Sequence, residues 1–369
     1  MSNARDLADL ADDATTVPTA AGAGNPNLII NGGMTVSQRG TSFSNPLNNA
    51  YLLDRWNIGY SAGTLNVDVT QDANGIFAAW GLDYSLKVDI QTAEAAIAAG
   101  EFCYIQQRIE AQNLQHLEFG AAGAQDLTLR FLVQSPKSGT HNFSLYQPDG
   151  TRSYQGEFTV TSADTPEEIT HTISGDTSGT INNDNGSGLE LNITLAAGST
   201  YQSTADTWTA GQDFGTSSGQ NLLDNTANNF YLGGVKLEAG SSATSFEHES
   251  YGDTLAKCQR YYYRRTESGT NSFVLGTGWT VSATRMRTSI FHPVSMRAEP
   301  TLDKSAIADF VIRYQAATTD CTSFQTTYNG SVDTMVVQTD CASVLSTGDS
   351  GLLMSDGAAS GWYSLSAEL

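Results

Sequence analysis

The chain has 369 residues, enough for two or three domains that each bury a core of their own. Only 15% of the residues are charged, and glycine, serine, threonine and asparagine are abundant, which is typical of turn-rich β proteins. The formal net charge of -21 argues against nonspecific nucleic-acid binding, because contacts with phosphate need clustered lysine and arginine.

The N-terminal region predicts one short helix. Residues 1–6 lack the basic-then-apolar order of a secretory signal, and no run of about 18 apolar residues follows, so we expect neither a signal peptide nor membrane insertion. Residues 4–15 place Leu7, Leu10, Ala11 and Ala14 on one helical face. A helix this short needs a partner, so residues 1–24 are expected to dock onto further copies or another protein; a frayed end without a role is the alternative.

Residues 25–247 show the period-two alternation of strands that bury one face. Polar loops separate the strands, and this pattern predicts a two-sheet antiparallel sandwich. Near the end of the region, Phe230 and Leu232 occupy one parity and Val235 and Leu237 the other, which predicts a β-bulge at Gly233-Gly234. The alternating segments are residues 65–69, 86–90, 127–133, 143–145, 158–160, 169–173 and 189–195.

Residues 248–264 predict a helical linker. Asp253 is the expected N-cap of a helix over residues 253–264, with Leu255, Cys258, Gln259 and Tyr262 on one face. Leu255 and Tyr262 are therefore candidate contacts between copies of the chain.

Residues 265–369 predict a second, smaller β-sandwich, with Asn329-Gly330 as a hairpin turn. The fold class is therefore all-β, with short helices only at the N-terminus and the linker. Cys321 and Cys341 flank the hairpin and could approach each other, but we favour free buried thiols.

Four short motifs carry a family resemblance: residues 27–34 (NLIINGGM), Gln38-Arg39-Gly40, residues 51–56 (YLLDRW) and residues 231–264. With these motifs, residues 1–265 resemble the carbohydrate-binding-module-like jelly roll of bacteriophage tail fibres and other virion appendage proteins. The resemblance implies a virion protein assembled in the host cytoplasm, a homotrimer, attachment to other virion proteins through residues 1–24, and recognition of host surface polysaccharide. It also places Trp56 in the core.

No recognisable catalytic constellation occurs, so we expect a structural protein without enzymatic activity or cofactor. His171 interrupts an apolar strand face and is expected to be a hydrogen-bonded core histidine. Structural calcium is possible, with Asp68, Asp72 and Asp89 as candidates by proximity in the sequence; the loop at residues 182–188 lacks the EF-hand spacing.

Aromatic side chains in polar segments are the candidate ligand contacts, because an exposed ring can stack on the apolar face of a sugar. For each, packing under a loop is the alternative. Two other functions stay open: a capsid-attached head fibre or decoration protein, and a polysaccharide-degrading appendage with paired carboxylates. The aromatic candidates are Trp80, Tyr84, Tyr146, Tyr154, Tyr201 and Trp208 in the first domain, and Trp279, Tyr328 and Trp362 in the second.

Overall fold

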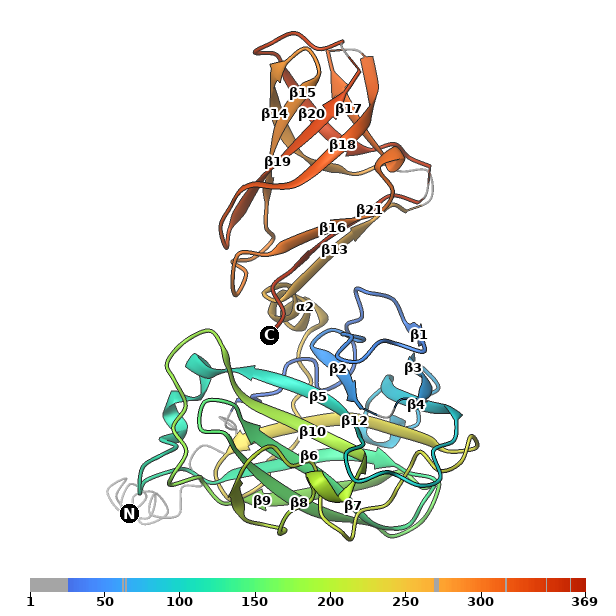
Figure 1. Ribbon diagram of the computed structural model, residues 1–369, viewed down its shortest axis with the longest axis vertical. Coiled ribbons are helices and arrows are strands. Elements are labelled where there is room, and N and C mark those ends of the chain that lie inside the picture. Colours follow the sequence, from blue (N-terminus) through green and yellow to red (C-terminus); the bar gives the residue numbers. More distant parts are fainter. Residues whose placement is uncertain are drawn as a thin grey trace, which may run out of the picture.

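The computed structural model describes residues 26–369 except 62, 64, 269–271, 316, 343 and 359, and it leaves the side chains of residues 326–328 undescribed. This part of the chain forms a β-sandwich, a narrow three-stranded neck and a barrel, stacked along the long axis of the molecule (Figure 1). The predicted all-β antiparallel class is confirmed. The expected helix over residues 4–15, with Leu7, Leu10, Ala11 and Ala14, lies outside the described residues.

The sandwich consists of two six-stranded antiparallel sheets. The first, called sheet A here, contains in spatial order β1 (Ser42–Ser44), β3 (Asn66–Asp72), β4 (Ser85–Thr92), β12 (Asn229–Ala239), β6 (Leu127–Gln134) and β9 (Glu167–Ile173). The second, sheet B, contains β11 (Trp208–Ala210), β8 (Arg152–Val160), β7 (Gly139–Gln147), β10 (Ser187–Ala197), β5 (Phe102–Glu110) and β2 (Trp56–Tyr60).

Alternating apolar side chains line the space between the two sheets, as the sequence pattern predicts. Along β10, for example, Leu189, Leu191, Ile193 and Leu195 are all buried in one continuous core. Trp56 lies in the same core and is fully buried. Its indole nitrogen donates a 3.1 Å hydrogen bond to the carbonyl of Asn31, so the polar end of the ring is also satisfied.

The predicted bulge in β12 is confirmed. The register between β12 and β6 shifts between Gly233 and Lys236, and Gly234 has a φ of 57°. The extra residue changes which parity faces the core, so that Leu232 before the bulge and Val235 after it are both buried. Glycine suits this position because a left-handed backbone is strained for residues with a Cβ atom.

The linker helix differs from the prediction in its start and its end. Helix α2 spans Tyr251–Gln259, and its N-cap is Ser250, whose hydroxyl accepts a 3.2 Å hydrogen bond from the Asp253 amide. Asp253 lies in the first turn instead, where its carboxylate accepts from the Ser250 hydroxyl. Ser250 rather than Asp253 is the N-cap because the helix begins at Tyr251, and the N-cap is the residue just before the first helical residue.

Tyr262 is therefore not a helical residue, and its predicted place on a helix face is wrong. It opens strand β13 (Tyr262–Thr266), which pairs with β21 (Trp362–Ser366) beside β16 (Thr301–Lys304) in the neck. The ring is buried against the sandwich, with the Arg39 guanidinium 3.4 Å from its centroid.

The second β unit closes into a barrel, whereas the sequence predicted two open layers. Its strands follow one another around the barrel, and β14 pairs with both β15 and β20, which removes the free sheet edges. They are β14 (Val274–Ser282), β15 (Arg285–Phe291), β19 (Thr334–Cys341), β18 (Ala317–Gly330), β17 (Phe310–Tyr314) and β20 (Ser350–Ser355).

The turn between β18 and β19 lies at residues 331–333, so the turn predicted at Asn329-Gly330 is misplaced by two residues. The Ser331 hydroxyl accepts hydrogen bonds from the amides of Asp333 and Thr334, which stabilises the later turn. Cys321 and Cys341 pair directly across β18 and β19 as free, buried thiols.

Short 3₁₀ segments complete the described chain. The longest is η2 (Ala111–Leu117), which directly follows β5. The other segments are η1 (Ala78–Trp80), η3 (Ser199–Tyr201) and η4 (Ile307–Asp309). A search of the described helices finds none with the length and apolarity needed to span a bilayer.

Arginine side chains join the sandwich to the neck. Arg55 is buried with its guanidinium 3.6 Å from the centroid of the Tyr261 ring, and it pairs with Glu368. Arg39 also binds Glu368, at 3.1 Å. The guanidinium of Arg260, which follows helix α2, donates two hydrogen bonds of 2.7 and 3.1 Å to the Glu110 carboxylate in β5. The Gln38-Arg39 and Asp54-Arg55 motifs thus hold the second unit as well as the sandwich.

Candidate functional site

The outer face of sheet A holds a small side-chain cluster that does not belong to the main core. Phe77, Leu82 and Leu132 are buried there, with Trp80 and Phe246 packed against them. The β12 bulge makes room for this cluster, because a Cβ atom on Gly233 would lie 2.9 Å from the Phe77 ring. The two glycines therefore let the loop before β4 pack directly onto the sheet.

Lys236 holds residues 244–247 against the same outer face of sheet A. Its ammonium group is fully buried and binds the Thr244 hydroxyl at 2.6 Å, Glu238 at 3.4 Å and Glu247 at 3.1 Å. Glu238 in turn accepts hydrogen bonds of 2.7 Å from both the amide and the hydroxyl of Thr244. Residues 244–247 are thus held against sheet A by a buried charge network.

Between the loop and this covering segment lies a hollow of about 160 Å³, which we call the Trp80 hollow. Trp80 and Phe246 line it as aromatic walls, and Leu82, Leu132 and Gly234 contribute apolar surface. The Trp80 ring is itself held edge-on by Phe77, with centroids 6.4 Å apart. Volume and lining suit a single small ring, since an engineered cavity of about 150 Å³ holds benzene.

Arg130 lines the Trp80 hollow, and Glu168 is its hydrogen-bond partner. Arg130 on β6 donates to Glu168 on β9 at 2.6 Å and to the Thr244 carbonyl at 3.1 Å. The hydrogen bond from Arg130 lowers the pKa of Glu168 below its usual value, with a further contribution from Trp80. The carboxylate is therefore held in its charged form beside the indole, where it can accept hydrogen bonds from a hydroxylated ligand.

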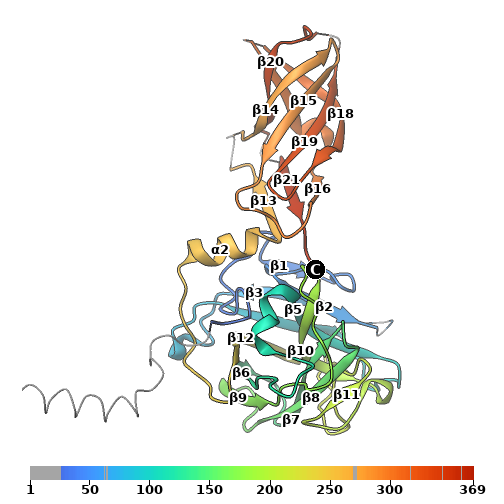
Figure 2. The ribbon, with the colours of Figure 1, turned by 90° about the vertical axis from the view of Figure 1, so that its left-hand side faces the viewer.

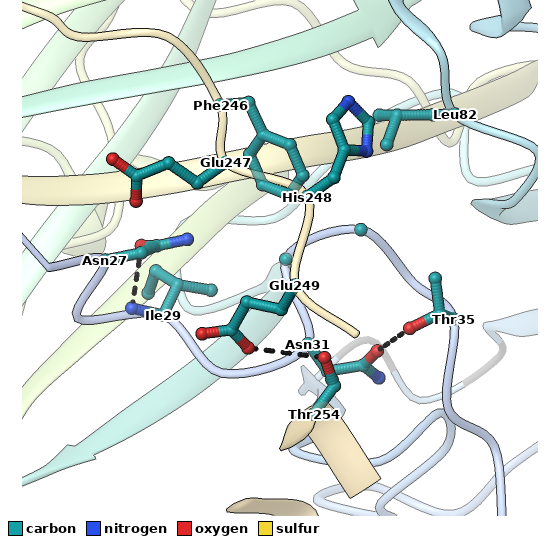
Figure 3. A pocket seen from close by; sticks show the side chains of 12 residues that line it. Asn27, Ile29, Asn31, Thr35, Leu82, Phe246, Glu247, His248, Glu249 and Thr254 are labelled. Atoms are coloured by element: carbon teal, nitrogen blue, oxygen red, sulfur yellow. Dashed lines mark hydrogen bonds between the residues drawn. The ribbon is translucent and has the colours of Figure 1, made fainter. Parts of the chain in front are cut away.

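A second, smaller hollow of about 60 Å³ is also lined by Phe246 (Figure 3). Side chains of residues 27–35 face those of residues 246–249 across it, and Leu82 and Phe246 line both hollows. Several polar groups here bond to each other, such as Thr254 to Glu249 at 3.2 Å. At this volume it holds a few waters beside the larger hollow.

The sheet B side offers a more open hollow of about 450 Å³ without an aromatic wall. Hydroxyl and amide groups of Ser199 and of residues 202–204 and 216–218 line it together with Glu157, which already accepts a 2.5 Å bond from Thr216. Along the outer face of sheet B, Asn57, Gln106, Asn192 and Ser144 bond in a row and are fully buried. This row is therefore closed to a ligand.

Of the six aromatic candidates in the first domain, Trp80 lines a hollow that is large enough for one small ring. Tyr154 is wrong as an exposed stacking residue: it is only 2% exposed and packs between Phe143 and Trp208. Its hydroxyl bonds to Asp206 and His171, so His171 is hydrogen-bonded as predicted but half-buried at the sandwich edge.

The remaining four candidates of the first domain do not line the Trp80 hollow. Tyr201 contacts Phe102 and Phe214, with centroids 4.9 and 5.2 Å away. The Trp208 indole donates to the Ser174 carbonyl at 2.7 Å. Tyr84 packs against the main core, and Tyr146 is half-buried, with burial raising its pKa.

In the second domain, Trp279 is 44% exposed on the barrel wall. Trp362 is half-buried in the neck, with the Arg264 guanidinium 4.2 Å from its ring centroid. The Tyr328 side chain lies outside the described residues. Leu255 is half-buried on helix α2.

The calcium candidates do not come together within the described chain. Asp68 and Asp89 face each other across β3 and β4, but Asp89 pairs with Lys87 at 2.8 Å and Asp72 accepts from Asn74. Among the described residues, no group of three or more His, Cys, Asp or Glu side chains is placed to hold a metal ion.

Among the residues that sequence reasoning missed are Leu82, Arg130 and Phe246, which line the Trp80 hollow, and Glu168, which accepts a hydrogen bond from Arg130. Three of them come from segments that are distant from Trp80 in the sequence, so no local spacing links them. Arg130 and Glu168 carry a weak signal, since both stand at outward parity on neighbouring alternating strands.

No protein-family model matches the chain, and a search of curated proteins finds no match. Among solved structures, the chain is similar to the enzymatically active domain of bacteriophage CBA120 tailspike protein 4 at 10% identity and a TM-score of 0.28, covering 58% of this chain and 21% of that one. A CBM4 structure matches at 12% identity and a TM-score of 0.29, covering 57% of this chain and 97% of the other.

A family 11 carbohydrate-binding module from a Clostridium thermocellum cellulase matches at 11% identity and a TM-score of 0.27, covering 56% of this chain and 98% of that one. The chain thus spans about a fifth of the tailspike domain and almost the whole of the two modules. At these TM-scores the likenesses carry no weight for function, and the assignment of a β-sandwich rests on the two sheets described above.

Proposed function

We propose that this protein binds saccharides through the Trp80 hollow and does not break them down. The observation that carries the proposal is a hollow of about 160 Å³ with two aromatic walls and with Arg130 in its lining, which donates a hydrogen bond to Glu168. An aromatic face packs on the C–H face of a pyranose, and a fixed ion pair offers both a donor and an acceptor to its hydroxyls.

The size of the hollow favours one sugar ring over a long chain. Ligand pockets for drug-sized molecules usually exceed about 300 Å³, so the Trp80 hollow suits a terminal or branching residue of a polysaccharide. A site of this size binds weakly by itself. Several copies on one particle raise the overall strength of attachment through effective concentration.

The test uses the full chain on an array of bacterial capsular polysaccharides and lipopolysaccharide O-chains. We expect the wild type to bind a subset of these glycans. Trp80→Ala removes the stacking wall and should weaken binding about tenfold, equivalent to about 1.4 kcal/mol, measured by titration calorimetry on a glycan that binds. Leu47→Ala, which alters a 79% exposed side chain that does not line the hollow, is the control and should bind like the wild type.

Binding of no glycan on the array, or equal binding by Trp80→Ala and the wild type on every glycan, would contradict the proposal. Chromatography of the glycans after incubation tests the non-enzymatic part. Polysaccharide chains of unchanged length are expected, and shortened chains would favour a degrading appendage instead.

We also propose that the binding serves a virion appendage, specifically a tail fibre of several copies. The sequence motifs of residues 1–265 that resemble phage appendage proteins support this, as does the elongated stack of sandwich, neck and barrel. Light scattering of the purified chain should give a trimer mass. Labelled antibodies on purified particles should mark the tail; marking of the head would favour the capsid-attached alternative, and a monomer mass would contradict the trimer.

A further inference from the structure

The outer wall of the barrel carries a row of side chains in direct cross-strand register. Trp279 on β14 pairs with Arg287 on β15, Arg287 pairs with Gln338 on β19, and Gln338 pairs with Gln325 on β18. These four strands lie side by side in the barrel (Figure 2). Four side chains from different parts of the sequence therefore form one line across the strands.

Hydrogen bonds join the three polar members of this row. Arg287 Nε donates to Gln338 Oε1 at 3.3 Å, and Gln338 Nε2 donates to Gln325 Oε1 at 2.8 Å. Gln338 points away from the barrel interior, but neighbouring side chains cover it and leave only 5% of the residue exposed. Planar amide and guanidinium groups are thus fixed before any ligand arrives, which lowers the entropic cost of binding.

The adjacent row, two residues along each strand, braces the first. Arg285 forms two hydrogen bonds with Asp340, of 2.6 and 3.0 Å, and the Ser323 hydroxyl donates to the same carboxylate at 2.9 Å. The pKa of Asp340 is lowered mainly by the bond from Arg285.

Trp279 ends the row as its exposed aromatic member. The next residue, Thr280, faces the interior and is 1% exposed, so the alternation of β14 directs the indole outward. A large apolar ring next to fixed planar polar groups offers both kinds of contact that a pyranose needs, namely a C–H stacking face and partners for hydroxyls.

We infer that this row is a second saccharide-binding surface, in which Trp279, Arg287 and Gln325 contact the interior of a linear glycan laid across the strands. The covered Gln338 positions Arg287 and Gln325. Four strands span roughly 14 Å at about 4.8 Å per neighbour, which is enough for a few sugar rings. The surface is open along its length, unlike the Trp80 hollow. It therefore needs no chain end, and it does not depend on the Trp80 hollow being a sugar site.

The test uses titration calorimetry of the full chain with each polysaccharide that the wild type binds on the bacterial array described above. Trp279→Ala should weaken binding of at least one linear polysaccharide about tenfold. Gln325→Ala, which truncates an exposed side chain, should weaken the same interaction about three- to fivefold without affecting the fold. The matched control is Phe291→Ala, which removes a 72% exposed ring from the same outer face of β15, outside the row.

The two sites give different patterns. A glycan that loses affinity with Trp279→Ala and Gln325→Ala but not with Trp80→Ala supports the barrel surface alone, and the reverse pattern supports the hollow alone. Equal binding by Trp279→Ala and the wild type on all glycans overturns the inference. So does an equal loss with Phe291→Ala, because that indicates nonspecific apolar adhesion, and so does the absence of any bound glycan.

Discussion

At the scale of single residues, Lys236 holds in place the segment that contributes Ser245 and Phe246 to the Trp80 hollow. Its ammonium group is fully buried and binds two carboxylates and the Thr244 hydroxyl. Removing one partner of a buried pair is costly because the remaining charge stays buried without compensation. The side chain of Glu238, which is 1% exposed, would be left in that state.

We therefore expect Lys236→Ala to lower the free energy of unfolding by about 3 kcal/mol or more. Urea denaturation followed by tryptophan fluorescence measures this. Lys87→Ala is the matched control, since Lys87 forms a partly exposed pair with Asp89 on the same outer face, and its loss should cost at most about 1 kcal/mol. A similar small loss for Lys236→Ala would contradict a structural role for the buried network.

Individual residues were predictable where parity alone decides their burial. Trp56 and the alternating leucines of β10 follow this rule. Tyr154 does not: it stands at inward parity beside polar residues, and the sequence cannot reveal that His171 from β9 and Trp208 from β11 close over it. The members of the Trp80 hollow, similarly, meet only through the pairing of strands far apart in the chain.

At the scale of elements, two glycines occupy positions with opposite backbone requirements. Gly234 has a φ of 57° in the β12 bulge, and a Cβ there would lie 3.1 Å from a Leu82 methyl carbon. Gly252 lies in helix α2, and a Cβ there would have its nearest neighbour at 3.9 Å. The same substitution should therefore have opposite effects at the two positions.

Gly234→Ala should destabilise the protein by about 1–2 kcal/mol, because a left-handed backbone is strained for alanine. Gly252→Ala should stabilise it by up to about 1 kcal/mol, because alanine restricts the unfolded chain and favours the helix. Thermal unfolding of both variants beside the wild type gives the signs. A stabilising Gly234→Ala would mean that the bulge tolerates another backbone conformation.

Elements with clean alternation were predictable, and those without it were missed. Strand β5 was not predicted because its sequence FCYIQQRIE is buried on both faces and lacks a polar–apolar period. The closure of the barrel depends on β14 pairing with β20, about 70 residues later, and no local signal fixes that register. The bulge was predictable because its parity change lies within one strand.

At the scale of the whole molecule, Glu368 is central to the junction between sandwich and neck. It is 6% exposed and pairs with both Arg39 and Arg55. Arg55 is 1% exposed, so removal of Glu368 leaves a buried guanidinium without its carboxylate, although its contacts with Tyr261 and the Arg108 carbonyl remain. The coupling of the two units should weaken more than the stability of either unit.

Glu368→Ala should therefore separate the unfolding of the barrel from that of the sandwich. Differential scanning calorimetry is expected to give two resolved transitions, or a broader one, where the wild type gives a single narrower transition. Asp303→Ala, on an exposed position of β16 in the same neck, is the control and should leave the profile unchanged. An unchanged profile for Glu368→Ala would show that the other junction contacts suffice.

The neck also determines how a pulling force reaches the sandwich. The chain enters the second unit along β13 and returns along β21. The residues that follow contact the sandwich: Glu368 pairs with Arg55, and the Leu369 carbonyl accepts hydrogen bonds from Arg108 and Tyr51. A force that pulls on the barrel therefore reaches the sandwich both along the covalent chain and through these side-chain contacts. Because Glu368 and Arg55 are almost fully buried, salt screens their ion pair only weakly, so this connection should persist at high ionic strength.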